Sequence, residues 1–207
     1  MKVWMKYWGK VKILLVFLLW CQSDQLLAQA DNWWEKEMTT LSGDQKNLRS
    51  LSGEQGLLLL FMDPDCPVTQ KYGATIRALY QEYHDKDIRI AAVYPLVMMQ
   101  QDKIRQFAEA YQYPFPHLLD PKLELTRAIG ASVTPEAFLL SSEGEILYQG
   151  AIDNWFYALG RYRRVITRHY LNDALAASLQ NQAVPVPKTE AIGCLIGTGM
   201  LHHSEHQ

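Results

Sequence analysis

The residues best suited to chemistry lie in the stretch DPDCPVTQKY, residues 63–72. Asp63-Pro64-Asp65 predicts a turn, because proline fixes its own φ and biases the residue before it toward extended geometry. Pro67 suits the first position of a helix, where its missing N–H costs nothing. Cys66 is therefore expected at a helix N-terminus, where the helix dipole favours a thiolate. Two alternatives stay open for this residue, a reactive thiol and a buried structural cysteine.

A second candidate feature is Thr134-Pro135, directly before the apolar run EAFLL (136–140). Proline is poorly tolerated inside a sheet, so Pro135 marks the start of a strand. A cis bond there would turn backbone polar groups of Thr134 outward, where they could pair with an extended peptide or hold a substrate sulfur. Only about 5–6% of X–Pro bonds are cis, so the context has to decide.

Cys194 is the one internal partner that the expected mature chain offers to Cys66. It lies in the apolar, glycine-flanked stretch AIGCLIG (191–197). A tail of a dozen extended residues reaches roughly 40 Å, enough to return this cysteine to the first. Three alternatives are open: a redox-active pair, a static disulfide that holds the tail, and independent thiols. A static disulfide that closes so long a loop would stabilise the folded protein by about 4–5 kcal/mol in the chain-entropy model.

The apolar pattern around these residues predicts the elements that must position them. GLLLLFM (56–62) is typical of a strand buried on both faces, and the three- and four-residue apolar spacing after Pro67 indicates an amphipathic helix. The order β-α-β-α followed by β-β-α predicts an α/β fold, a mixed central sheet with helices on both faces. The further expected elements are a strand at 88–95, a helix at 101–113, an edge strand at 115–120, a helix at 122–130, a hairpin of 136–140 and 145–150, and a helix at 168–181.

Residues 1–30 have the features of a cleaved signal peptide. Four lysines precede or flank the apolar segment 13–20, and LAQA (27–30) ends in an A-x-A cleavage site. The apolar segment is too short to span a bilayer, and an uncleaved N-terminal anchor is the alternative. Cleavage would also remove Cys21. A periplasmic or secreted protein is therefore expected.

The rest of the chain is expected to form one domain over 31–182 and a C-terminal tail over 183–207 that carries Cys194. The net charge of −2 leaves no basic footprint for nucleic acid. HHSEH (202–206) contains metal-ligand residue types without a defined spacing, so no metal site is predicted. RYRRVITRH (161–169) is a local basic cluster, expected as a solvated segment, with docking of an acidic partner as the alternative.

Several pieces together resemble the thioredoxin fold, and more narrowly exported redoxins related to thiol-disulfide oxidoreductases and peroxiredoxins. They are LLLLFMDPDCPVTQKY for the strand–cysteine–helix unit, VTPEAFLL for the cis-proline strand and EGEILYQGAIDNWF for the hairpin and its exit. TRHYLNDALAASL and KTEAIGCLIG resemble one branch of this group. The resemblance implies that Cys66 is the active-site thiol and Pro135 the cis-proline facing it.

The sequence departs from both kinds of relative around Cys66. Thioredoxins carry a second cysteine three residues after the first, where this chain has Thr69, whose hydroxyl can only hydrogen-bond the thiolate. Peroxiredoxins carry Thr or Ser three residues before their cysteine and Pro seven before, where this chain has Asp63 and Leu59. These departures speak against peroxide reduction and imply a single-cysteine centre whose resolving thiol lies elsewhere.

The expected function is an exported thiol-disulfide oxidoreductase. The Cys66 thiolate would attack a disulfide, Thr69, Thr134 and Pro135 would position the partner, and Cys194 or an external thiol would resolve the mixed disulfide. Attack requires an accessible thiolate, so the site is expected at the surface. The alternatives are a thiol peroxidase and a non-catalytic binding or metal-handling module with a structural Cys66–Cys194 disulfide.

The partners implied are protein or small-molecule disulfides, a thiol electron donor and a membrane-associated redox partner. No cofactor is implied.

Overall fold

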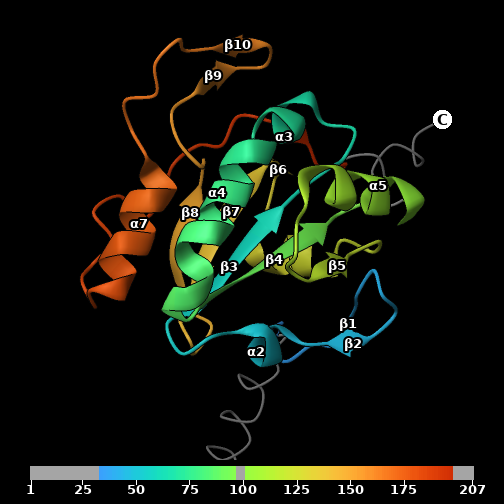
Figure 1. Cartoon of the computed structure of the whole chain (residues 1–207). Helices are drawn as coiled ribbons and strands as arrows, with labels where there is room; N and C mark the ends of the chain where they lie inside the picture. The colour runs from blue at the N-terminus through green and yellow to red at the C-terminus, as the bar shows by residue number, and fades with distance from the viewer. Residues whose placement is uncertain (1–32, 97–100, 198–207) are drawn as a thin grey trace, which may run out of the picture. The chain divides into compact units, whose positions relative to one another are not determined.

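The computed structural model describes residues 33–96 and 101–197 (Figure 1). The expected signal segment 1–30 and the stretch 202–206 lie outside these residues. Within the described part, no helix is both long enough and apolar enough to cross a membrane.

A five-stranded mixed sheet forms the centre of the fold, with the strand order β5-β4-β3-β7-β8. β3 pairs in parallel with β4, which pairs in parallel with β5, whereas β7 is antiparallel to both β3 and β8. The α/β prediction with a mixed sheet is confirmed. The strands are β3 (Gly56–Phe61), β4 (Ile88–Tyr94), β5 (His117–Leu119), β7 (Glu136–Leu140) and β8 (Ile146–Gly150).

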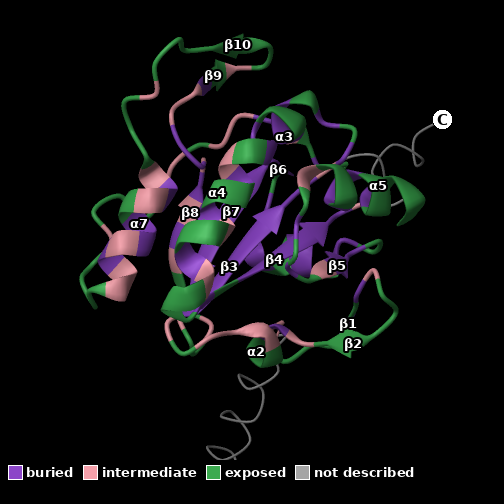
Figure 2. Cartoon of the chain, in the orientation of Figure 1, coloured by how far each residue is buried: buried purple, intermediate pink, exposed green. Residues whose placement is uncertain are grey.

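The central position of β3 follows from its composition. All six of its residues are buried, and successive side chains of a strand point to opposite faces. Leu58 and Leu60 therefore enter one hydrophobic core, and Leu57 and Leu59 enter another. Figure 2 shows β3 buried along its length, and β4 beside it is buried at every residue except Arg89. A strand with no polar side chain is stable only where both faces are covered.

Helices cover both faces of the sheet, as predicted. Apolar residues of α4, α5 and α7 join the core on the Leu58 side, and those of α2 and α6 join the core on the Leu57 side. Figure 1 shows α4 crossing in front of β3. The helices are α2 (Leu48–Leu51), α3 (Pro67–Lys71), α4 (Gly73–Tyr83), the 3-10 turn η1 (His84–Lys86), α5 (Gln101–Tyr111), α6 (Glu124–Ile129) and α7 (Tyr170–Leu179).

The helix expected from Pro67 onward is divided at Tyr72, which ends α3 and precedes α4. Gly73 follows the division, and a Cβ on this residue would overlap the ring of Tyr111. The Tyr113 hydroxyl donates to the Gly73 carbonyl at 3.2 Å. The break thus lets α5 and the chain after it approach the start of α4 closely.

Three two-stranded sheets lie outside the five-stranded one, and the sequence analysis predicted none of them. They pair β1 with β2, β9 with β10, and β6 with β11, each antiparallel. Their strands have only two or three residues, too few to show a periodic apolar pattern. They are β1 (Met38–Thr39), β2 (Gln45–Lys46), β6 (Val133–Thr134), β9 (Phe156–Ala158), β10 (Arg161–Tyr162) and β11 (Cys194–Leu195).

Candidate active site

Cys66 occupies the N-cap position of α3, with Pro67 at the first helical position, as predicted. The backbone of Cys66 is extended, at φ −77° and ψ 116°, and its carbonyl accepts from the Gln70 N–H at 3.0 Å. The preceding turn is closed by the Asp65 N–H, which donates to Asp63 Oδ1 at 2.9 Å. The sulfur therefore lies where the carboxyl end of β3 meets a helix start, the edge where open α/β sheets place their sites.

Cys66 and Cys194 form a disulfide, with their Cα atoms 5.9 Å apart across 128 residues of sequence. A bonded pair is common to the redox-active and the static alternatives and excludes independent thiols in this state. Cys66 is only 1% exposed, whereas Cys194 is half-buried. The expectation of an accessible Cys66 is therefore wrong for the disulfide-bonded protein, because the tail lies over this residue.

The Thr134-Pro135 peptide bond is cis and lies beside the disulfide. The Thr134 carbonyl oxygen is 3.1 Å from Cys66 Sγ. A disulfide sulfur carries no proton, so this contact is a hydrogen bond only when Cys66 is a thiol. The structure thus brings together four of the predicted site residues, Cys66, Thr134, Pro135 and Cys194, from three distant parts of the sequence.

The tail itself occupies the edge of β6 as an extended strand. Cys194 pairs with Thr134 and Leu195 with Val133. The pairing continues at Ile196, whose N–H donates to the Ser132 carbonyl at 2.9 Å and whose side chain is buried in the core on the Leu57 side. One anchor of the tail therefore lies two residues after Cys194.

A second anchor lies before Cys194, at Thr189. The Thr189 hydroxyl accepts from the Ala151 N–H at 2.9 Å and hydrogen-bonds the Tyr148 hydroxyl at 2.7 Å. The Thr189 N–H donates to the Gln149 carbonyl at 2.9 Å. Cys194 is thus held between two points attached to the body of the fold.

Thr69 lies at the third position of α3 and is fully buried. Its hydroxyl has no hydrogen-bond partner, and within the described residues it is the one buried side-chain polar atom in this condition. The expected hydrogen bond to the Cys66 sulfur is absent from the disulfide-bonded protein. This unpartnered hydroxyl requires an explanation, because a buried polar group without a hydrogen bond lowers the stability of the fold by about 1–3 kcal/mol.

The charges near Cys66 are partly balanced. Asp65, whose carboxylate would oppose a nearby thiolate, forms an ion pair with Lys103 at 2.8 Å. Burial raises the pKa of Asp63 above its usual value of 3.8. Both effects reduce the negative charge that Cys66 would meet on ionisation.

Two buried carboxylates, Glu136 and Asp153, support the site, and no role was predicted for Asp153 from the sequence. Glu136 accepts from the Ser132 N–H at 2.8 Å and so holds the loop that leads into the cis peptide. Asp153 accepts from the Tyr72 hydroxyl at 2.6 Å, and burial together with this carboxylate raises the pKa of Tyr72. The sequence feature that could have indicated these supporting carboxylates is an acidic residue at the edge of an apolar run.

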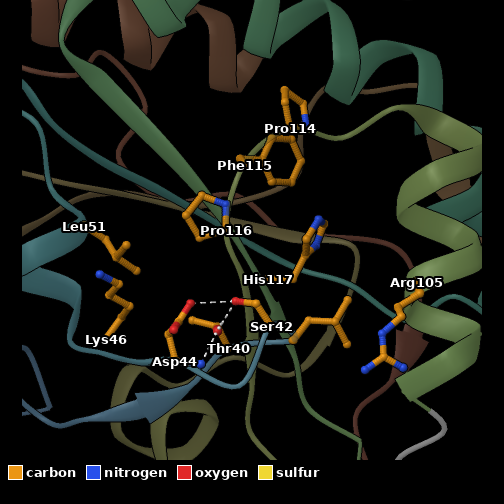
Figure 3. A pocket seen from close by; sticks show the side chains of 11 residues that line it. Thr40, Ser42, Asp44, Lys46, Leu51, Arg105, Pro114, Phe115, Pro116 and His117 are labelled. Atoms are coloured by element: carbon orange, nitrogen blue, oxygen red, sulfur yellow. Dashed lines mark hydrogen bonds between the residues drawn. The ribbon is translucent and has the colours of Figure 1, made fainter.

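A pocket of about 480 Å³ lies away from the disulfide, between the β1–β2 hairpin, β5 and α5. Figure 3 shows Lys46 on one side of it and Arg105 on the other, with Asp44 hydrogen-bonded to Ser42. His117 in its lining bonds the Tyr94 hydroxyl at 3.0 Å. None of the predicted site residues lines this pocket.

Comparison with known proteins identifies relatives of this chain. Residues 30–149 match the AhpC/TSA family model. A curated relative, the thiol-disulfide oxidoreductase ResA of Halalkalibacterium halodurans, is 29% identical over 107 residues, which are 52% of this chain and 59% of that protein. The match thus spans less than two thirds of the relative's length.

Solved structures share the fold. An uncharacterized conserved protein from Geobacillus kaustophilus superposes with a TM-score of 0.69 at 21% identity, over 79% of this chain and 89% of that one. A secreted Mycobacterium tuberculosis disulfide oxidoreductase gives a TM-score of 0.51 at 16% identity, over 73% and 98%. The fold is thioredoxin-like, and the chain belongs to the AhpC/TSA family.

Proposed function

We propose that this protein is a thiol-disulfide oxidoreductase whose redox-active pair is Cys66 and Cys194. The observation that carries the proposal is the disulfide between the N-cap of α3 and the tail strand on the cis-proline edge. The family and the activity named for the curated relative support it. A disulfide at a helix start is suited to exchange, because the helix dipole stabilises the thiolate that leaves.

The mechanism begins with the reduced pair. The Cys66 thiolate attacks one sulfur of a substrate disulfide, which forms a mixed disulfide and releases the other substrate sulfur as a thiolate. The Cys194 thiolate then attacks Cys66 Sγ, forming the internal disulfide and releasing the second substrate sulfur. The substrate is reduced by two electrons, and a thiol donor returns the protein to the dithiol state.

The neighbouring residues have distinct roles in this proposal. Once the disulfide opens and Cys194 leaves the β6 edge, Thr134 and Pro135 present this edge to the substrate chain, and the Thr69 hydroxyl donates to the Cys66 thiolate. That role would account for a buried hydroxyl that lacks a partner in the oxidised state. The anchors at Thr189 and Ile196 hold Cys194 near Cys66, which favours internal resolution over an external thiol.

We further propose that the catalytic domain spans 31–182, that the tail 183–207 supplies the resolving cysteine, and that residues 1–30 direct export to the periplasm or the outside. The thiol donor would then act in that compartment, and a membrane-associated redox partner is consistent with it. N-terminal sequencing of the protein recovered from the periplasmic fraction tests the export and its cleavage point.

The decisive experiment is alkylation trapping of the folded protein across a series of redox buffers. The proposal expects the two thiols to appear together at one potential, and a Cys194→Ser variant to accumulate mixed disulfides with a model disulfide substrate. Cys66→Ser should abolish reduction of that substrate. A pair that resists excess dithiothreitol until the protein unfolds would instead identify a static disulfide. Consumption of hydrogen peroxide by the reduced protein, measured in parallel, would identify a thiol peroxidase instead.

A further inference from the structure

The segment 154–172 differs in charge from the rest of the protein. The whole chain has a net charge of −2, yet this segment contains no Asp, Glu or Lys. Its positive charge comes from four arginines, and no ion pair within the described residues involves them. They are Arg161, Arg163, Arg164 and Arg168.

Large apolar side chains accompany these arginines on the surface. Four of them, between 50% and 68% exposed, lie within nine residues of sequence. Two of them belong to the β9–β10 sheet, which is not part of the central sheet, and Figure 2 shows β10 and the chain after it exposed. These side chains are Tyr157, Leu159, Tyr162 and Val165. We refer to residues 156–165 as the arginine hairpin.

The arginine hairpin is joined to the helix that begins at Cys66. The Tyr72 ring, at the end of α3, packs against Trp155 and Phe156 with ring centroids 5.4 Å and 5.7 Å apart. Lys71 Nζ lies 4.9 Å from the centroid of the Tyr162 ring. Figure 1 shows β9 and β10 beyond the sheet at the end where α3 lies. Since α3 rises about 1.5 Å per residue, these contacts lie roughly 8 Å from Cys66 along the helix.

The side-chain types favour a protein partner over a membrane surface. Protein interfaces are enriched in Tyr and Arg and depleted in Lys, and the planar guanidinium binds carboxylates in a bidentate manner. Arg163 also lies over the Tyr157 ring at 5.3 Å, which keeps an aromatic and a cation together on the surface. The complementary surface is therefore acidic, with apolar side chains among the carboxylates.

We propose that the arginine hairpin is the docking surface for an acidic protein whose thiols or disulfide exchange with the Cys66–Cys194 pair. This inference rests on the proposed function and names the class of its redox partner. Docking next to α3 places the partner's reactive segment beside the disulfide. Exchange with the partner is accelerated because the charges steer the encounter.

The test measures kcat/KM for reduction of three probes by the dithiol form of the full chain. Two are synthetic peptides with one disulfide loop, identical except that the flanking residues are Glu in one and Ser in the other. The third is hydroxyethyl disulfide, which is small and uncharged. We expect the acidic peptide to react about tenfold faster than the Ser peptide at low salt, and the difference to shrink as salt screens the charges.

The test variant carries Arg161→Glu, Arg163→Glu and Arg164→Glu. We expect it to lose the preference for the acidic peptide and to reduce hydroxyethyl disulfide at the unchanged rate, which also shows that it is folded. A control variant with the same change in net charge elsewhere, Lys46→Glu, Arg77→Glu and Lys122→Glu, should keep the preference.

Other outcomes overturn the inference. Equal rates for the acidic and Ser peptides, with hydroxyethyl disulfide still reduced, would refute the docking surface and leave the proposed function intact. No reduction of any probe would refute the proposed function itself. Cosedimentation with phosphatidylglycerol vesicles that needs the three arginines, without a preference for the acidic peptide, would identify a membrane surface instead.

Discussion

Replacing Gly193 by alanine tests whether the docked tail controls the redox pair. A Cβ on this residue would fall well within 3.0 Å of the Thr134 carbonyl oxygen, a backbone atom that cannot rotate away. The residue directly precedes Cys194, which pairs with Thr134. In the disulfide-bonded protein, where Cys194 is held on β6, the alanine therefore forces the tail strand to shift away from the β6 edge.

The size of the effect follows from the bonds that such a shift weakens. Losing one or two backbone hydrogen bonds between β6 and the tail costs about 1–2 kcal/mol at about 1 kcal/mol each. In the dithiol form no covalent bond holds Cys194 to Cys66, so the short segment between the anchors at Thr189 and Ile196 can shift, and the penalty falls mainly on the oxidised state. Because about 1.4 kcal/mol equals about 30 mV for a two-electron couple, we expect the reduction potential of the pair to rise by about 20–45 mV.

The assay is alkylation of the thiols after equilibration in glutathione buffers, read by mass. Gly197→Ala is the matched control, because a Cβ there has open space around it in the same tail. We expect this control to keep the wild-type potential. If Gly193→Ala also keeps it, the tail does not stabilise the disulfide through the β6 edge, and the reasoning fails.

Three further predictions concern polar side chains that are buried or half-buried. Tyr72→Phe removes the donor to Asp153, and we expect the free energy of unfolding in urea to fall by about 1–3 kcal/mol; an unchanged midpoint would contradict this. Thr69→Val should leave the oxidised protein at least as stable as the wild type. In the reduced protein it should raise the pKa of the Cys66 thiol, measured by thiolate absorbance, and an unchanged pKa would refute the proposed hydrogen bond. Burial lowers the pKa of His117 below 6.5, so below that pH the unfolded chain binds a proton that the folded chain does not. The free energy of unfolding should therefore fall as the pH drops below 6.5, and His117→Gln should make it less dependent on pH. Equal pH dependence of the wild type and the variant would refute this role of His117.

Much of the fold could be predicted because its main elements carry strong local patterns. The apolar run of β3 and the periodic residues of α4 identify a buried strand and an amphipathic helix without reference to anything distant. The β9–β10 and β1–β2 hairpins could not be predicted in this way. Their strands are too short, and several of their residues too exposed, for burial to impose an alternation of apolar and polar residues.

In the candidate site, too, the features set by neighbouring residues were predictable and those set by distant contacts were not. The N-cap position of Cys66 was predictable, because Pro67 and the preceding turn act on their immediate neighbours. The cis bond at Pro135 came from a resemblance and from no local rule. The unpartnered hydroxyl of Thr69 was unpredictable, since its burial and its lack of a partner depend on how distant parts of the chain pack around it.

By itself, the sequence determined which segments are strands and helices and that a cysteine begins a helix at the carboxyl end of the central strand. Only the tertiary structure decided that Cys194 is bonded to Cys66, that the tail covers it and that Thr134 borders the pair. Local preferences act over a few residues, whereas a contact across 128 residues depends on the route of the whole chain. That route is set by packing, here by Thr189 and Ile196 on either side of Cys194.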